Sequence, residues 1–146
     1  MTRTEEKMRT YVLGSVIAVG VLMAGRATLA HHSFAAEFDA SKPVTMTGLV
    51  TKVEWVNPHV WFYINVKDPA TGEVTNWGAE MGPPHGLQRR GWRRETLKIG
   101  EKVTVAGSLA KNGSKRMNAR TVTLTATGGR PGEKLDAASS EGGNNP

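Results

Sequence analysis

Hydrophobic and polar residues alternate through the middle of the chain, and this pattern predicts β-strands. The clearest stretch is HVWFYINVK at 59–67, where hydrophobic residues from Val60 to Val66 occupy every second position. A strand before it, 44–55, loses its alternation at Gly48, which predicts a bulge or a sharp bend. A third strand, 74–81, follows the turn residues DPATGE. The first half therefore predicts an antiparallel meander.

The second half of the chain adds a helical connection and two more strands. Gly82-Pro83-Pro84 ends the third strand. The segment 85–96 has helical character but is interrupted by Gly91, so it predicts one short helix or two turns, with Leu87 and Trp92 expected to face inward. Strands at 102–109 and 116–125 flank Asn-Gly, the strongest short hairpin signal. Five strands with one short helix between the third and fourth predict an all-β fold, a small OB-fold-like β-barrel. A plain β-sandwich-like meander is the alternative.

The two ends of the chain differ from this middle region. Residues 1–30 have a basic start, an apolar run and then small residues, the order of a cleaved signal peptide. The alternative is an uncleaved anchor, although the apolar run of about 15 residues is shorter than the ~20 that span a bilayer. The domain is then expected at 31–127, and the polar, glycine-rich segment 128–146 is expected to be a disordered tail.

Composition limits the compartments and the partners that the sequence allows. The chain has no cysteine, so an exported domain would rely on its core, a metal or a partner rather than on disulfides. The net charge of +6 falls to +4 without residues 1–30, which hold four basic and two acidic residues. Export to the periplasm or the medium, with no membrane span after cleavage, favours an envelope protein, an anionic lipid or a polysaccharide surface as partner. It argues against nucleic acid.

Two short motifs carry a resemblance to a known family. HHSFAAEFD at 31–39 and EWVNPH at 54–59, together with a tryptophan-glycine strand and a GW-containing segment, resemble a family of short exported bacterial proteins, domain of unknown function six-one-five-two. The resemblance covers roughly residues 30 to 124. It implies a small exported β-domain and supplies no mechanism.

The histidines offer the sharpest chemical hypothesis, because two of the four are adjacent at the expected cleavage site. If cleavage follows Ala30, His31 gains a free α-amine beside its imidazole, and both can chelate one metal ion. A second imidazole, from His59 or His85, would complete a histidine brace, with His32 as an alternative or supporting ligand. Nitrogen ligands in a tetragonal plane suit Cu(II), and zinc is the less favoured alternative.

A plainer interpretation of the same histidines stays open. His31 and His32 can be solvated, His59 can cap the turn after Asn57-Pro58, and His85 can lie in a surface loop. No fixed spacing of the HExxH or Cys/His kind supports a metal site.

A second candidate site surrounds the break between the first two strands. Polar and aromatic side chains there could form a binding rim, and the third strand could bring further members beside it. The predicted rim consists of Glu54, Trp55, Asn57, Trp61, Trp77 and Glu80. Equally, the tryptophans could fill the barrel end while Glu54 is solvated.

A run of arginines gives the strongest charge feature. Such a run could bind an anionic partner, although a solvated helix face anchored by one aromatic is the commoner explanation. The candidate patch is Arg89, Arg90, Trp92, Arg93 and Arg94.

Two function classes remain. The first is an exported, non-enzymatic β-barrel binding domain with a histidine-bound metal such as copper. The second is a small metal-dependent redox or accessory enzyme that uses the same histidines. Nucleophile motifs, phosphate-binding loops and dinucleotide fingerprints do not occur in the sequence. Their absence lowers the expectation of an enzyme, and the sequence identifies no catalytic residue.

Overall fold

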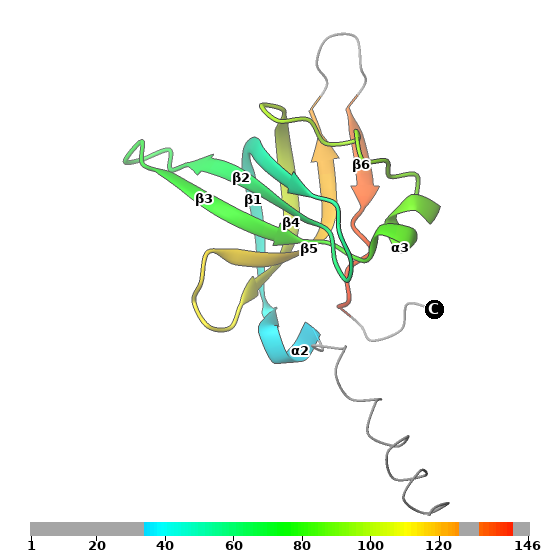
Figure 1. Cartoon of the computed structure of the whole chain (residues 1–146). Helices are drawn as coiled ribbons and strands as arrows, with labels where there is room; N and C mark the ends of the chain where they lie inside the picture. Colours follow the sequence, from blue (N-terminus) through cyan, green and yellow to red (C-terminus); the bar gives the residue numbers. More distant parts are fainter. Residues whose placement is uncertain (1–33, 126–131, 142–146) are drawn as a thin grey trace, which may run out of the picture. The chain divides into compact units, whose positions relative to one another are not determined.

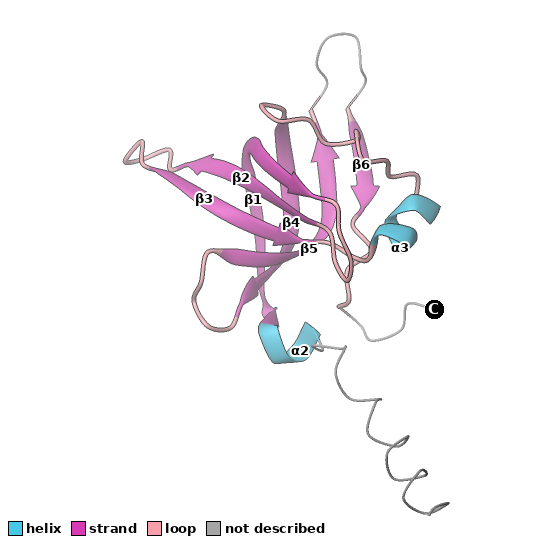
Figure 2. Cartoon of the chain, in the orientation of Figure 1, coloured by secondary structure: helices cyan, strands magenta, loops and turns pink. Residues whose placement is uncertain are grey.

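The computed structural model describes residues 34–125 and 132–141 (Figure 1). These residues form strands and two short helices, and strands dominate (Figure 2). The helices are α2 (Phe34–Glu37) and α3 (Pro84–Arg89). The strands are β1 (Phe38–Glu54), β2 (Trp61–Lys67), β3 (Val74–Glu80), β4 (Lys102–Ala110), β5 (Arg116–Leu124) and β6 (Glu133–Asp136).

The strands close into one barrel with the connectivity of an OB-fold. β1 pairs with β4 through its first part and with β2 through its last part, and β2 pairs with β3, all antiparallel. β4 pairs with β5, and a short parallel ladder between β3 and β5 closes the ring. With α3 between β3 and β4, this arrangement confirms the all-β, OB-like prediction.

The long strand β1 changes partner where the sequence pattern slips. Leu49 pairs with Lys102 of β4 on one side and with Asn65 of β2 on the other. A side chain at Gly48 would bring its Cβ to 2.5 Å from the Asn65 carbonyl oxygen, so only glycine lets the strands approach this closely. The register shift itself falls two residues later, between Val50 and Lys52. The bend is thus where the sequence predicts it, and the bulge follows it.

The barrel core is formed by side chains from one face of the strands. Val60, Phe62 and Ile64 are fully buried, as their alternation predicts, and Val103 and Val105 of β4 meet them in the same core. Apolar burial of this kind is the main favourable contribution to folding.

The connection consists of a short helix followed by turns, in line with the predicted interruption at Gly91. α3 ends at Arg89, and Gly91 adopts a φ of 89°, outside the helical region. The two inward-facing residues are also correct: Leu87 and Trp92 are both fully buried. The connection packs as an irregular cap rather than as a regular helix.

The C-terminal segment departs from the expected disordered tail. Residues 133–136 form β6, which pairs with β5 and makes a sixth strand beside the five predicted. Leu135, Ala137 and Ala138 are buried, so three small or medium apolar side chains suffice to anchor a segment that looks polar overall. Residues 126–131 and 142–146, and the predicted signal peptide at 1–30, lie outside the described residues.

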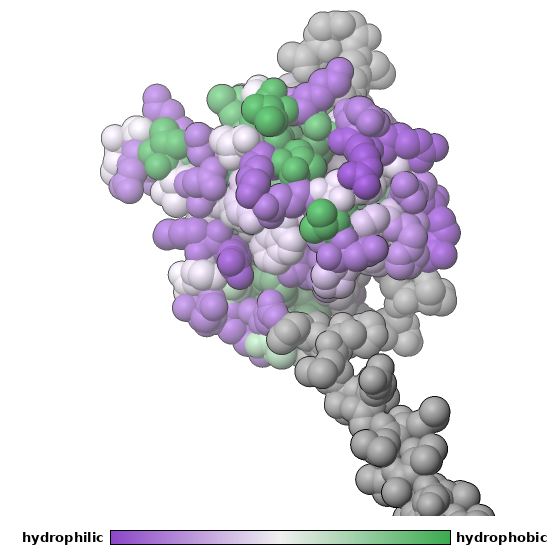
Figure 3. All heavy atoms as spheres, in the orientation of Figure 1, coloured by the Kyte–Doolittle hydropathy of each residue, from purple (hydrophilic) through white to green (hydrophobic). Residues whose placement is uncertain are grey.

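One face of the described surface is mostly polar. The face in Figure 3 shows hydrophobic side chains only in small areas. The large hydrophobic residues with substantial exposure are Leu49, Val56, Val74 and Ile99. Within 34–125 and 132–141, no helix is long and apolar enough to cross a membrane.

Candidate functional site

A histidine–carboxylate pair lies where β2 begins and β3 ends. Nδ1 of His59 is 2.8 Å from Oε1 of Glu80, whose side chain is only 7% exposed, while that of His59 is 30% exposed. The backbone fixes this pair, because Val60, the next residue after His59, exchanges hydrogen bonds with Met81 and Gly82 immediately after Glu80. A buried carboxylate needs such a partner, since an unpaired buried charge is costly.

The pair perturbs the ionisation of the histidine. The hydrogen bond to Glu80 raises the pKa of His59 above its usual 6.5; partial burial opposes this shift, and the charges of Glu80 and Glu37 reinforce it. Because Nδ1 faces the carboxylate, Nε2 is the ring nitrogen left for another ligand. A carboxylate that holds Nδ1 fixes the ring orientation in the way seen around metal-bound histidines.

An aromatic row lies on the same face of the sheet. Residues directly opposite each other on neighbouring strands share a face, and Trp61 lies opposite both Glu54 and Glu80. Tyr63 follows on β2 and donates a hydrogen bond of 3.0 Å to Oε2 of Glu54. Gly78 lies opposite Tyr63, and a Cβ there would meet the rings of Tyr63 and Trp61 within 3.3–3.6 Å. The two rings therefore use the space that a larger residue would fill.

Cations cover these rings. Arg116 lies over Trp61, with 5.4 Å between the guanidinium carbon and the ring centroid. Lys52 lies 5.4 Å from the centroid of Tyr63 and pairs with Glu54. The hydrogen bonds from Lys52 and then Tyr63 lower the pKa of Glu54. This face could therefore bind a ligand both through hydrogen bonds to its charged side chains and through flat apolar contact with its aromatic rings.

The predicted binding rim is therefore partly assembled. Glu54, Trp61 and Glu80 lie on this one face. Trp77 lies opposite Ile64 and packs against the core, so it belongs to the other face, with Lys115 over its ring. Trp55 is buried in the core cluster, and Asn57 is exposed just before a cis peptide bond to Pro58.

The four predicted metal ligands are not brought together by the described residues. His85 is exposed on α3, and His31 and His32 lie outside the described residues. Within 34–125 and 132–141, no three His, Cys, Asp or Glu side chains are close enough to hold a metal ion. His59 with Glu80 is thus at most part of a metal site, and further ligands would have to come from elsewhere.

A family model with no assigned function, "Family of unknown function (DUF6152)", matches residues 18–119, which is more than half of the chain. The chain belongs to this family. The match confirms the resemblance carried by HHSFAAEFD and EWVNPH, and it includes all four histidines of the DUF6152 chain. No curated protein matches it.

One solved structure with a similar fold is the mitochondrial single-stranded DNA binding protein Rim1 of S. cerevisiae. It is 11% identical, it covers 60% of this chain and 96% of its own, and the TM-score is 0.47. The sequence analysis excluded nucleic acid as a partner on the basis of compartment alone, and this finding corrects that exclusion. At this level of similarity the neighbour assigns no partner to the DUF6152 chain, and the OB-like fold is established here by the strand order.

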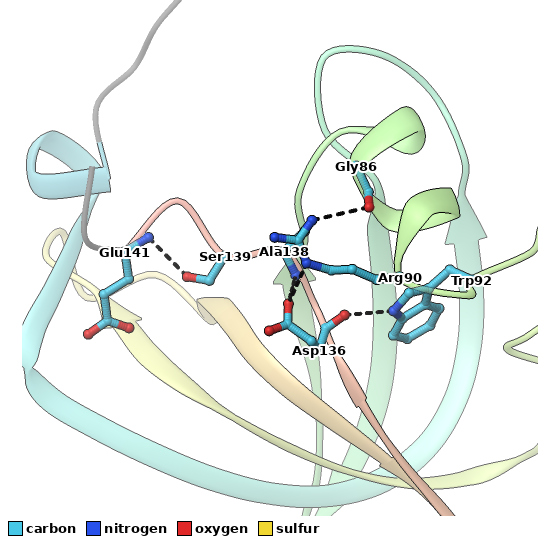
Figure 4. Close-up of polar contacts among 7 residues, drawn as sticks. All are labelled: Gly86, Arg90, Trp92, Asp136, Ala138, Ser139 and Glu141. Carbon is cyan, nitrogen blue, oxygen red and sulfur yellow. Dashed lines mark hydrogen bonds and ion pairs between the residues drawn. The ribbon is translucent and has the colours of Figure 1, made fainter. Parts of the chain in front are cut away.

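Arg90 and Arg93 donate to backbone carbonyl groups of the helical connection, and Arg94 donates to one just after β1. Arg93 donates to the carbonyl of Trp92 at 2.9 Å, and Arg94 donates to that of Trp55 at 3.3 Å. Arg90 donates to Gly86 and pairs with Asp136 of β6 at 3.1 Å (Figure 4). Such bonds satisfy carbonyl groups that a regular helix would pair internally, which supports a structural role for these side chains.

Sequence patterns gave no signal for several residues of this region. Alternation along 59–67 already places Tyr63 on the face of Trp61, whereas Arg116 joined these rings only through the strand register. Ser108 and Asn118 are buried polar residues within strands β4 and β5, and an isolated serine or asparagine in a strand gives no indication of its partner.

The His59–Glu80 pair predicts a pH dependence of stability in the metal-free protein. Because the folded pKa of His59 is raised above 6.5, its contribution is fully present below pH 6.5 and is lost as the pH rises through the folded pKa. From about pH 5.5 to about pH 8.5, the free energy of unfolding of the wild type should fall relative to that of His59→Gln. Urea denaturation at several pH values measures this, with His85→Gln as a control that follows the wild type. Parallel pH curves for the wild type and His59→Gln would refute it.

Proposed function

We propose that the protein is an exported, non-enzymatic β-barrel domain that binds a metal ion such as copper through histidines. The observation that supports this most is the His59–Glu80 pair, in which a buried carboxylate at 2.8 Å from Nδ1 orients the ring. Nε2 then remains for a metal ion. The carboxylate raises the ligand strength of the imidazole, as such partners do around metal-bound histidines.

The position of α2 relative to His59 also supports the proposal. The charge of Glu37, the last residue of α2, acts on His59. α2 is fastened to the barrel by the buried Phe38 and by a hydrogen bond from the Lys111 amide to the Glu37 carbonyl. In the sequence, His31 and His32 come shortly before this helix.

Cleavage after Ala30 would give the site its remaining ligands. The α-amine and imidazole of His31 would supply two nitrogens and His59 Nε2 a third, a set that favours Cu(II) among divalent ions. The basic start, the apolar run and the small residues before His31 support export to the periplasm or the medium.

The test begins with the natural protein recovered from its host compartment. Mass spectrometry should find His31 as the first residue. Titration with Cu(II) and Zn(II) should then show that His59→Gln weakens copper binding by about 10- to 100-fold, and that Glu80→Gln weakens it by about 10-fold. His85→Gln is the matched control and should stay within about twofold of the wild type.

Two results would sink the proposal: a first residue other than histidine, or copper binding that His59→Gln leaves unchanged. The same copper-loaded samples separate the alternative class. Oxygen consumption with a reductant, abolished by His59→Gln, would identify a redox enzyme instead of a binding domain.

A further inference from the structure

The chain after β6 crosses the barrel next to the candidate site. We use the word strap for residues 137–141. Ala137 pairs by backbone hydrogen bonds with Arg120 of β5 and with Gly82 beyond β3, both at 2.9 Å. Beyond Ala138 the contacts become polar: Ser139 donates to Asn118 at 2.5 Å, and Glu141 accepts from Ser108 at 3.3 Å. Figure 4 shows this segment from Asp136 to Glu141.

The strap supplies the hydrogen-bond partners of two fully buried polar side chains. Ser108 and Asn118 are 0% exposed, and the side-chain contacts they make are with Ser139, Ser140 and Glu141. Buried polar groups without hydrogen-bond partners destabilise the folded state. The strap therefore stabilises the barrel by providing these partners from within the same chain. Without it, these two side chains would present a hydroxyl and an amide to an incoming polar group.

The strap also lies alongside the His59–Glu80 pair. Glu80 is paired in register with Asn118, which Ser139 contacts. Two residues after Glu80, Gly82 is so close to the strap that an added Cβ would clash with Ala138. The strap therefore contacts Gly82, two residues after Glu80, and Asn118, the residue beside Glu80 on β5. Glu80 is the residue that orients His59.

The attachment of the strap divides into a firm part and a weak part. Leu135, Ala137 and Ala138 are buried apolar residues. Ala138 has a φ of 50°, in the left-handed region that a non-glycine residue adopts only at an energetic cost. The contacts of residues 139–141 include side-chain hydrogen bonds and an ion pair at 3.4 Å between Glu141 and Arg120, whose side chain is 52% exposed. Exposed ion pairs contribute little to stability, so this end is the one that opens.

We propose that residues 139–141 are a releasable cover over Ser108 and Asn118, hinged at Ala138, and that their release opens the neighbouring His59–Glu80 pair to solvent and to a metal ion. The metal part of this statement rests on the proposed function. The cover itself does not, and the experiment below contains no metal.

A charge exchange across the ion pair tests the cover in the full chain. Arg120→Glu and Glu141→Arg each place like charges together, whereas the double variant restores an opposite pair in reversed order. The readout is carbethoxylation of His59 by diethyl pyrocarbonate at about pH 8.5, where imidazole is mostly neutral, with the exposed His85 as an internal reference. Amide hydrogen exchange of Gly82 and Ala137 shows that the firm part stays in place.

Each single variant should raise the modification rate of His59 relative to His85 by about threefold to tenfold, and the double variant should return to within about twofold of the wild type. Lys134→Glu, an equal charge reversal on the exposed side of β6, should change nothing. Unchanged His59 reactivity in both single variants overturns the proposal, as does a double variant that reacts as fast as the singles. If copper binding fails while this pattern holds, the proposed metal function is wrong and the cover stands.

Discussion

Trp92→Ala is expected to lower the free energy of unfolding by about 3–5 kcal/mol. Trp92 is fully buried and among the largest side chains in the core. Its indole Nε1 also donates a 2.7 Å hydrogen bond to the carbonyl of Asp136 (Figure 4), so one side chain joins the α3 connection to β6. Alanine would leave a cavity and an unpaired carbonyl at once. Equilibrium denaturation in urea, followed by circular dichroism, measures the loss.

Two variants separate the contributions of Trp92. Trp92→Phe keeps most of the apolar packing and loses the hydrogen bond, so it should cost about 1–3 kcal/mol. Trp77→Ala removes an indole that is only partly buried and should cost clearly less than Trp92→Ala. Equal losses for Trp92→Ala and Trp77→Ala would show that Trp92 does not anchor the connection.

Gly107→Ala is expected to destabilise the barrel by about 3 kcal/mol or more. An alanine Cβ at this position would lie 1.9 Å from the carbonyl oxygen of Asn118 and 2.9 Å from its carbonyl carbon. These are backbone atoms on the paired strand, so relief requires β4 and β5 to separate at their register shift between Ala106 and Gly107. The reason is space alone, because Gly107 is not among the residues with a positive φ.

Gly86→Ala is the matched control. It lies in α3, and an added Cβ would meet its nearest neighbour, Pro83, at an ordinary 3.5 Å. Because alanine favours helix over glycine, this variant should be neutral or more stable by a few tenths of a kcal/mol. Thermal and urea denaturation of the two variants give the comparison. A Gly107→Ala protein as stable as Gly86→Ala would mean that the close approach of β4 and β5 is not required.

The family of this chain has no assigned function, and individual contacts distinguish His59 from His85. The His59–Glu80 pair has a physical signature that a solvated surface histidine lacks: a buried carboxylate, a fixed ring nitrogen and a raised pKa of His59. His85 is exposed on α3 and serves as its natural comparison. This contrast is the reason that the copper, pH and modification experiments all use the two histidines together.

Local patterns foretold the parts of the fold that depend on neighbours in the sequence. Alternation located β2 and β3 to within about two residues, and Gly48 marked the bend in β1. Burial of one face of a strand imposes this period of two, so it can be read without knowing which strand lies alongside. Gly91 likewise marked the interruption of the helical connection, where it adopts a positive φ.

The candidate site was foretold only in part, for the same reason. EWVNPH drew attention to Glu54 and His59, and the meander suggested that Glu80 would be near. Which tryptophans join them depended on strand register: a shift of one residue moves a side chain to the other face, which is how Trp61 belongs to the site and Trp77 does not. The polar composition of the C-terminal segment hid β6, because three buried apolar residues are too few to form a pattern.

The sequence by itself determined the all-β class, the strand order compatible with a small barrel, and the inward positions of Leu87 and Trp92, since each follows from local periodicity and turn chemistry. Only the tertiary structure decided that His59 meets Glu80, that arginines bind backbone carbonyls, and that the strap covers Ser108 and Asn118. Those contacts join residues from about 20 to over 30 positions apart, or depend on an irregular backbone. Their energies come from burial and hydrogen-bond geometry, which exist only after the chain has closed into the barrel.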